Sequence, residues 1–324
     1  MYLLELGGED DRFAAAEARA AATEVSVLAP GIGTASAITV PRLETLAFTH
    51  RASTAIGTAT GGTAAATSLL ESASLDRTGS VAVRARNVRN TAAVDTPAVE
   101  RELGAILVDH GLTVDLEAPD HELRALFSED TVALGWLVAE SVRDYGQRRP
   151  TDRPFFQPGG MSPLLARALV NLSLLEESGD AVLLDPMCGT GGTLIEAGLV
   201  GARPVGVDAQ PRMVRGTRRN LETYLTDEYA VLCGDATRLP LNDDIATAVV
   251  VDIPYGRQSK RARHDAPTLH TGALAEAHRL APRAVVVADH ALDSAIETTD
   301  WTLTDQFERR VHRSLVRHIH VLSR

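Results

Sequence analysis

A stretch that ends in a carboxylate, a proline and an aromatic ring is the part of the sequence best suited to chemistry. Residues 249–251 are all valine, and Asp252, Ile253, Pro254 and Tyr255 follow them directly. Ligands of open α/β sheets bind at the carboxyl ends of the strands, which is where these residues would lie. A hydrogen-bond acceptor, a stiff turn and a stacking face together suit a planar group that carries an NH2. The pattern therefore predicts chemistry on the amine of a nucleobase.

A glycine-rich turn earlier in the chain predicts a cofactor site. Residues 183–194 read LLDPMCGTGGTL, so a strand ends at Asp185 and a helix follows Gly189 and Gly191. Glycines allow a ligand to approach the backbone closely, at an exposed helix N-terminus. The spacing fits neither the dinucleotide motif nor the P-loop, and the preceding acid favours a cationic cofactor over a pyrophosphate. An ordinary tight turn between a strand and a helix is the alternative.

Two more predicted strands end near aspartates. Asp208 follows the next apolar run, and its position suits hydrogen bonds from a ribose diol. Asp235 follows the third run and could accept a hydrogen bond from the amine of an adenine. Each of these acids alone is also common at a strand end. The signal comes from their order, because four successive strands end close to an acid.

Composition limits the class of protein. The chain has 324 residues, enough for about two domains, and 44% of them are hydrophobic. It has no apolar run of 18 or more residues, so we expect no membrane span. The amino terminus lacks the basic and apolar regions of a signal peptide. Only two cysteines, Cys188 and Cys233, occur, which argues against a disulfide framework and favours a cytoplasmic protein.

The charge composition is unusual. The formal net charge is −11, and Lys260 is the only lysine among 32 basic residues. This resembles proteins adapted to high internal salt and predicts a halophilic organism, in which RNA recognition would depend on shape and a few well-placed arginines. An acidic enzyme with a small substrate would have a similar composition. The ten histidines show no spacing typical of metal ligands, so we expect no metal.

A polar, proline-bounded stretch at residues 145–154 is typical of a domain boundary. Before it, we expect a small α+β module. Alternation predicts a strand at 81–86 with an arginine face, and helical spacing behind Thr96 as the N-cap predicts a helix at 97–110. Residues 131–142 fit a strand or a helix.

After this boundary, helices alternate with apolar strands. This order predicts a doubly wound α/β domain with a parallel sheet. The expected strands are 181–184, 204–207, 229–232, 247–251 and 284–288. Residues 311–322 alternate and predict one final antiparallel strand, with Arg317 on its polar face.

These motifs, in this order, resemble those of the S-adenosyl-L-methionine-dependent methyltransferases that act on exocyclic amines. Such enzymes carry Asp/Asn-Pro-Pro-Tyr after the fourth strand. More narrowly, RPFFQPGGMSPLLAR at 153–167, DPMCGTGG at 185–192 and DIPYGR at 252–257 resemble the archaeal tRNA guanine-N2 methyltransferases that modify guanosine 10. Residues 50–145 resemble the tRNA-binding THUMP domain of that family.

The resemblance implies the fold class and the domains. It implies an α/β, Rossmann-like S-adenosyl-L-methionine-dependent methyltransferase domain, preceded by an α+β THUMP-containing RNA-binding region. The expected parts are an N-terminal ferredoxin-like piece at 1–50, a THUMP tRNA-binding domain at 51–145, a linker at 146–160 and the methyltransferase domain at 161–324.

The resemblance also implies S-adenosyl-L-methionine as the cofactor. Asp185 would lie near its methionine part, with Gly189 and Gly191 in the same loop. Asp208 would bind its ribose and Asp235 its adenine. The residues expected to help wall the cofactor are Phe155, Phe156 and Pro158, although plain core packing would explain the two phenylalanines as well.

For the target, the resemblance implies a guanine N2 amine, which is a poor nucleophile because its lone pair is delocalised into the ring. Asp252 and the backbone carbonyl of Ile253 would accept hydrogen bonds from this amine. Tyr255 would stack on the flipped base, and Pro254 would stiffen the turn. Asp252 need not be a strong base, because the product ammonium can lose its proton to solvent. Ile253 replaces the second proline of the family pattern, which leaves the rigidity of the turn open.

Arginines are the candidate contacts to the phosphates of tRNA. The expected set is Arg84, Arg86, Arg149 and Arg153, with Arg89 and Arg148 as further candidates. A solvated arginine face is the alternative for all of them.

Other functions remain open at this point. The target could be another amine of tRNA or ribosomal RNA, and the chain could be a non-catalytic tRNA-binding protein. The sequence does not decide between one methyl group and two, or between a monomer and a homodimer.

Overall fold

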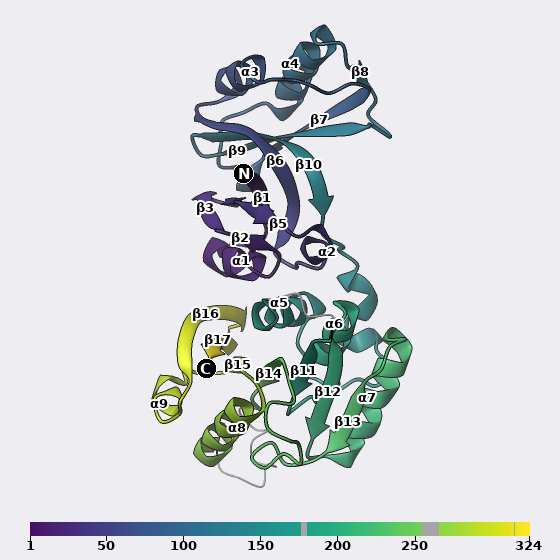
Figure 1. Ribbon diagram of the computed structural model, residues 1–324, viewed down its shortest axis with the longest axis vertical. Coiled ribbons are helices and arrows are strands. Elements are labelled where there is room, and N and C mark those ends of the chain that lie inside the picture. Colours follow the sequence, from purple (N-terminus) through teal and green to yellow (C-terminus); the bar gives the residue numbers. More distant parts are fainter. Residues whose placement is uncertain (176–179, 255–265, 314) are drawn as a thin grey trace. The chain divides into compact units, whose positions relative to one another are not determined.

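The protein has two compact units, each with its own sheet, in the computed structural model (Figure 1). The units are Met1–Val142 and Arg143–Arg324. The structure describes residues 1–175, 180–254, 266–313 and 315–324.

The first unit contains an eight-stranded sheet in the order β3-β4-β1-β6-β10-β9-β7-β8. Its strands pair antiparallel, except that β7 runs parallel to both β8 and β9. The strands are β1 (Tyr2–Leu6), β3 (Ser26–Ala29), β4 (Ile32–Ala35), β6 (Thr49–Thr60), β7 (Ser80–Asn87), β8 (Thr113–Val114), β9 (His121–Ser128) and β10 (Thr131–Glu140). A separate small sheet pairs β2 (Ala22–Thr23) with β5 (Ala37–Ile38).

Helices α3 and α4 pack together on one face of this sheet (Figure 1). The core between these helices and the sheet fully buries Leu103 and Leu107 of α4 and Phe127 of β9. The helices of this unit are α1 (Asp11–Ala18), α2 (Val40–Leu43), α3 (Thr63–Glu71) and α4 (Thr96–Asp109), and η1 (Val88–Asn90) is a short 3-10 turn. The N-cap of α4 is Asp95, whose carboxylate accepts from Ala98 N, and not Thr96 as expected.

Strand β6 connects the first part of the chain to the rest of this unit. It pairs with β1 on one side and with β10 on the other. One sheet therefore joins residues on both sides of the division expected between residues 50 and 51. Residues 131–140 form strand β10, which resolves the ambiguity between strand and helix.

The second unit contains a seven-stranded sheet in the order β13-β12-β11-β14-β15-β17-β16. The first five strands in this order are parallel, and β17 and β16 complete the sheet antiparallel. The strands are β11 (Val182–Asp185), β12 (Arg203–Asp208), β13 (Ala230–Cys233), β14 (Ala248–Asp252), β15 (Arg283–Ala288), β16 (Thr302–His312) and β17 (Leu315–Ser323). The predicted doubly wound domain with a largely parallel sheet is confirmed.

Helices cover both faces of this sheet, which explains why the central strands are continuously apolar. Val249 and Val251 of β14 pack in a core with α8 and α9, and Val250 is equally buried. The helices are α5 (Pro163–Ser173), α6 (Gly192–Leu199), α7 (Pro211–Tyr224), α8 (Ala266–Leu280) and α9 (Asp293–Ile296), with 3-10 turns η2 (Tyr145–Arg148) and η3 (Pro150–Asp152) ahead of them. Within the described part of the chain, each helix is too short or too polar to cross a membrane.

The C-terminal region differs from the prediction. We expected one strand over 311–322, but β16 ends at His312 and β17 begins at Leu315, so two strands form a hairpin. Both strands alternate, and the residues between them, Arg313 and Ser314, give only a weak turn signal, from the serine.

Candidate active site

The predicted acids meet at the carboxyl edge of the parallel strands. Asp185, Asp208 and Asp252 are the last residues of β11, β12 and β14, and Asp235 follows β13 by two residues. These four strands are neighbours in the sheet and run in the same direction. The structure therefore brings the four predicted acids to one edge, the position at which open α/β sheets bind ligands.

Asp185 is the most deeply placed of these acids. Its residue is 4% exposed, and one carboxylate oxygen accepts a hydrogen bond from the Met187 amide at 3.1 Å. Burial raises the pKa of Asp185 to about 8, and the negative charges of Asp252 and Asp208 act in the same direction. A cation bound beside Asp185 would favour its ionised form.

The glycine-rich turn between β11 and α6 has a backbone that needs glycine. Gly189 and Gly191 have φ angles of 52° and 78°, in the left-handed region. A Cβ atom on Gly191 would also lie 2.7 Å from Cγ2 of Thr217. Two hydrogen bonds hold the turn: Gly189 N donates to Asp208 Oδ2 at 3.1 Å, and Thr217 Oγ1 donates to Gly189 O at 2.6 Å.

The other two acids, Asp208 and Asp235, each accept hydrogen bonds from residues of the turn that follows them. The second carboxylate oxygen of Asp208 accepts from Gln210 N at 2.8 Å, and burial raises the pKa of this acid. Asp235 Oδ1 accepts from both the amide and the hydroxyl of Thr237, at 2.9 and 2.8 Å. A carboxylate has about four acceptor positions, so both acids can still accept hydrogen bonds from a ligand.

The segment before α5 is fastened to the glycine turn by helix α7. The Asn220 side chain accepts from Phe155 N at 2.8 Å and donates to Phe155 O and Thr190 O, both at 2.9 Å. The Phe155 ring lies so close to α7 that a Cβ atom on Gly216 would be 2.0 Å from its Cδ1. Sequence reasoning missed Asn220 and Gly216, because neither residue belongs to a motif.

The two other predicted wall residues have more solvent contact. Phe156 is 42% exposed, and Pro158 is exposed as well. Phe155, by contrast, packs against α7, which matches the packing alternative considered for it. The roles of Phe156 and Pro158 in walling a cofactor stay predictions.

Three arginines of this region are interior groups. Arg148 Nε and Arg167 Nη2 contact the fully buried carboxylate of Glu196, at 2.9 and 2.8 Å. Arg153 is 4% exposed; its Nε donates to Arg148 O at 3.2 Å and its Nη1 to Thr190 Oγ1 at 3.5 Å. Such buried guanidinium groups do not present their charge to a phosphate at the surface. The expected contacts of Arg148 and Arg153 with tRNA are therefore corrected to contacts within the protein, whereas Arg149 is exposed.

In the first unit, Arg84 and Arg86 lie on β7 and are partly exposed. Arg84 donates to Leu116 O at 2.6 Å, and Arg86 binds the buried carboxylate of Glu5 at 2.9 Å. Arg124 binds the same carboxylate at 2.8 Å. Arg86 is thus partly neutralised within the protein, which sequence patterns alone could not reveal.

The turn after β14 holds the predicted catalytic residues. The Asp252 side chain is 26% exposed, and its Oδ2 lies 3.6 Å from Nη2 of Arg317. Its Oδ1 atom is buried and has no hydrogen-bond partner among the described residues. Burial raises the pKa of Asp252 to about 6; Arg317 opposes this rise and Asp289 adds to it.

Ile253 continues the ladder of hydrogen bonds beyond the end of β14. Its amide donates to Val287 O at 2.9 Å, and its side chain is 1% exposed in the core under α8. A proline at this position would have no N–H for that bond. Pro254 is half-buried, and Tyr255 lies outside the described residues.

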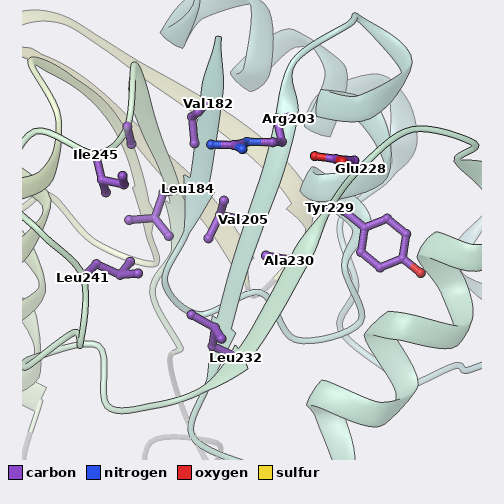
Figure 2. Close-up of a pocket in the computed structure, with 11 residues that line it drawn as sticks. Val182, Leu184, Arg203, Val205, Glu228, Tyr229, Ala230, Leu232, Leu241 and Ile245 are labelled. Carbon is purple, nitrogen blue, oxygen red and sulfur yellow. The ribbon is translucent and has the colours of Figure 1, made fainter. Parts of the chain in front are cut away.

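A separate apolar hollow of about 270 Å³ lies across β11, β12 and β13 (Figure 2). Val182, Val205 and Leu232 line it, with Arg203 and Glu228 at its margin. It includes none of the predicted site residues and is not at the carboxyl edge. In the described ranges, the histidines, cysteines and acids form no group of three or more that could hold a metal ion.

Known proteins with similar sequences identify the domains of the chain. Residues 150–319 match the family of RMKL-like methyltransferase domains, and residues 63–136 match the THUMP domain. The tRNA (guanine(10)-N2)-dimethyltransferase of Methanothermobacter thermautotrophicus is 42% identical over 251 residues, covering 76% of this chain and 73% of the relative. The protein of the same name from Methanocaldococcus jannaschii is 36% identical over 264 residues, covering 76% and 71%.

Among solved structures, TrmN from Thermus thermophilus has a similar fold. Its TM-score is 0.53 at 18% identity, with 100% of this chain and 99% of that chain covered. The predicted combination of a THUMP domain and a Rossmann-like methyltransferase domain is confirmed. By its sequence similarity to the archaeal enzymes, the chain belongs to the family of the tRNA (guanine(10)-N2)-dimethyltransferases.

Proposed function

We propose that the chain methylates the N2 amine of guanosine 10 in tRNA, with S-adenosyl-L-methionine as the methyl donor. Membership of the family supports the reaction and the class of RNA. The observation that carries the proposal is Asp252, which places a buried carboxylate oxygen without a partner among the described residues at the carboxyl edge. An unsatisfied acceptor at this position suits an N–H donor from a substrate.

The residues around the glycine turn fit the proposed cofactor. When bound, S-adenosyl-L-methionine supplies a methyl group on a positively charged sulfur. Asp185, whose buried carboxyl has a pKa of about 8, is the kind of acid that a cationic ligand stabilises. We propose that the glycine turn and Asp185 hold the methionine part, Asp208 the ribose and Asp235 the adenine. Phe156 and Pro158 would cover the cofactor from the solvent side.

Asp252 and the backbone of Ile253 would orient the target amine. The N2 nitrogen of guanine becomes a better nucleophile when its lone pair is turned out of conjugation with the ring. Oδ1 of Asp252 and the carbonyl of Ile253 would accept its two N–H bonds, and Tyr255 would stack on the extruded base. Transfer would break the bond between the methyl group and the sulfur, which would leave a neutral thioether, as the N–C bond forms. The positive charge would pass to the nitrogen, which would then lose a proton to solvent or to Asp252.

Positioning accounts for most of the catalysis in this proposal. Fixing two reactants in a near-attack geometry contributes about 7–11 kcal/mol. Loss of one group that is preorganised for the charge of the transition state typically costs about 100-fold to 1000-fold in rate. The Asp252→Ala variant is therefore expected to lose at least this factor while the cofactor site stays intact.

Contacts with tRNA are proposed for the partly exposed Arg84 and Arg86 of the THUMP-containing unit and for the exposed Arg149. Charge-reversing changes at Arg84 and Arg149 should weaken binding to tRNA of any sequence, because phosphate contacts carry no base information. They should leave the affinity for S-adenosyl-L-methionine unchanged.

The test is mass spectrometry of nucleosides from tRNA incubated with the protein and S-adenosyl-L-methionine. We expect N2-methylguanosine or N2,N2-dimethylguanosine with the wild-type chain, and neither with Asp252→Ala. Calorimetric titration of the cofactor should give similar affinities for the two proteins. Methylation of an adenine or a cytosine, or full activity of Asp252→Ala, would contradict the proposal. Binding of tRNA without any transfer would support the non-catalytic alternative instead.

A further inference from the structure

We propose that Arg317, on the C-terminal strand β17, is a positioning residue that keeps Asp252 ionised and oriented for the target amine. The inference rests on the proposed function, because it takes the amine as the ligand of Asp252. From the sequence, Arg317 was expected only on the polar face of a final strand. In the structure it is 5% exposed and lies beside the acid of the predicted catalytic turn.

The two oxygens of Asp252 have different surroundings. Oδ2 lies 3.6 Å from Nη2 of Arg317, a charge–charge contact that is longer than a hydrogen bond. Oδ1 is buried and has no hydrogen-bond partner among the described residues. Arg317 thus attracts one oxygen and leaves the other available. That division suits a carboxylate that must accept an N–H bond in a fixed direction.

The sheet topology explains how a C-terminal residue reaches this site. Asp252 is level with Val287 of β15, and Val287 is level with Ile319 of β17. Arg317 stands two residues before Ile319, on the same face of the sheet. Because β17 runs antiparallel to β15, this step leads beyond the carboxyl ends of the parallel strands. The antiparallel hairpin therefore places a cation at the carboxyl edge of the parallel strands, where the four predicted acids lie.

Several charged groups surround Asp252 from the neighbouring elements. Asp185 comes from β11, and Asp289 follows β15. His290 contacts Asp289 at 2.7 Å, and the ring of His270, on α8, lies 5.3 Å from that of His290. On β17, His318 faces Glu308 at 3.4 Å.

The balance of these charges predicts the effect of removing Arg317. Burial and Asp289 raise the pKa of Asp252, to about 6, and Arg317 acts against them. Loss of an arginine beside a carboxylate typically raises its pKa by about one to three units. Because the ionised carboxylate is the stronger acceptor and the form that stabilises a positive charge on the amine, the acid limb of the rate profile should then move to higher pH.

The experiment is the pH dependence of single-turnover methyl transfer, with tRNA and S-adenosyl-L-methionine saturating at each pH. For Arg317→Gln we expect the acid limb to move upward by about one pH unit or more. If the limb moves by one pH unit, the rate measured at a pH below the wild-type pKa falls about tenfold. The rate should recover at about pH 9. Arg317→Lys keeps the charge and should keep the profile close to that of wild type.

A control on the same hairpin separates a specific effect from a general change in charge. Arg310, on β16, is exposed, and Arg310→Gln should leave the profile unchanged. A purely structural role of Arg317 would lower the rate by the same factor at every pH. That result, or an unchanged profile in Arg317→Gln, would overturn the proposal.

Folding is checked by circular dichroism and by cofactor binding. If Arg317→Gln does not fold, the double variant Asp252→Asn/Arg317→Gln, which removes both charges, should fold, since neither partner is left as an unpaired buried charge. Failure of the double variant to fold would mean that Arg317 serves the hairpin and not Asp252. Absence of transfer by the wild-type chain would instead refute the proposed function, so the two failures are distinguishable.

Discussion

Binding of S-adenosyl-L-methionine should expel a proton from Asp185. The pKa of this buried acid is about 8, so at pH 7 about nine-tenths of the molecules carry it protonated. A cation beside the carboxyl favours the ionised form, and the proton must then leave. We expect binding to release about 0.9 proton at pH 7 and about 0.1 at pH 9.

The same competition sets the pH dependence of the affinity. The ionised fraction of a group with a pKa of about 8 increases about fiftyfold between pH 6 and pH 8. The affinity for the cofactor should therefore rise by a factor approaching this value and then level off above pH 8. The affinity increases with pH because the raised pKa leaves Asp185 mostly protonated below pH 8. This proton must be lost before the carboxylate can pair with the cation.

Isothermal titration calorimetry in two buffers with different ionisation enthalpies counts the released protons. Asp185→Asn is the matched control, because its amide cannot release a proton in this range. S-adenosylhomocysteine, which lacks the charge on sulfur, should release fewer protons than S-adenosyl-L-methionine. Tight binding by the wild-type chain at pH 7, with no difference between the buffers, would refute the reasoning.

Three further substitutions test how the site is held. Gly216→Ala should force Phe155 away from α7 and destabilise the protein by about 1–3 kcal/mol, with weaker cofactor binding; adding Phe155→Ala should recover part of the stability, and no recovery would argue against this contact. Ile253→Pro should lower the free energy of unfolding by about 1–3 kcal/mol, measured by urea denaturation, because Val287 O loses its donor, whereas equal stability would show that this bond is dispensable. Glu196→Gln should cost about 3–5 kcal/mol, because two buried arginines lose their carboxylate, and a melting temperature like that of wild type would contradict this role of the carboxylate.

The outcome at Ile253 shows what a family pattern can and cannot say. A proline stiffens the family's turn, so its replacement here left the rigidity open. The structure gives Ile253 a hydrogen bond to Val287 that proline could not form. The turn is therefore fixed by a different means, and restoring the family residue is expected to weaken it.

The strands and their terminal acids could be predicted, because both depend on short stretches of sequence. An apolar run such as 249–251 signals a buried parallel strand by itself. A residue that directly follows such a run lies at its carboxyl end, whatever else the chain does. The four acids were therefore placed at one edge without knowledge of the packing.

Residues that act across elements could not be predicted in this way. Asn220 and Gly216 lie in the middle of α7, where nothing in the local pattern distinguishes them from other helix residues. Arg317 reaches Asp252 only because β16 and β17 form a hairpin. The sequence alternates through this region and therefore predicted one strand instead of two. Their roles depend on which elements become neighbours.

The arginines were misjudged for a related reason. Arg153 looks like a surface cation in a polar, proline-bounded stretch, but it lies in the interior beside Thr190. Burial of an arginine requires partners, and here one is the nearby Arg148 carbonyl and the other comes from the distant glycine turn. Composition gives the charge of such a stretch, but not whether its arginine side chains point into the protein or toward solvent.

The most direct test of the central claim compares two tRNAs that differ by a single amine. One carries guanosine at position 10, and the other carries inosine, which lacks only the N2 amine. With S-adenosyl-L-methionine and the wild-type chain, we predict methyl transfer to the guanosine and none to the inosine, with similar binding of both tRNAs. Equal transfer to the two RNAs would contradict the assignment of this amine as the target of Asp252.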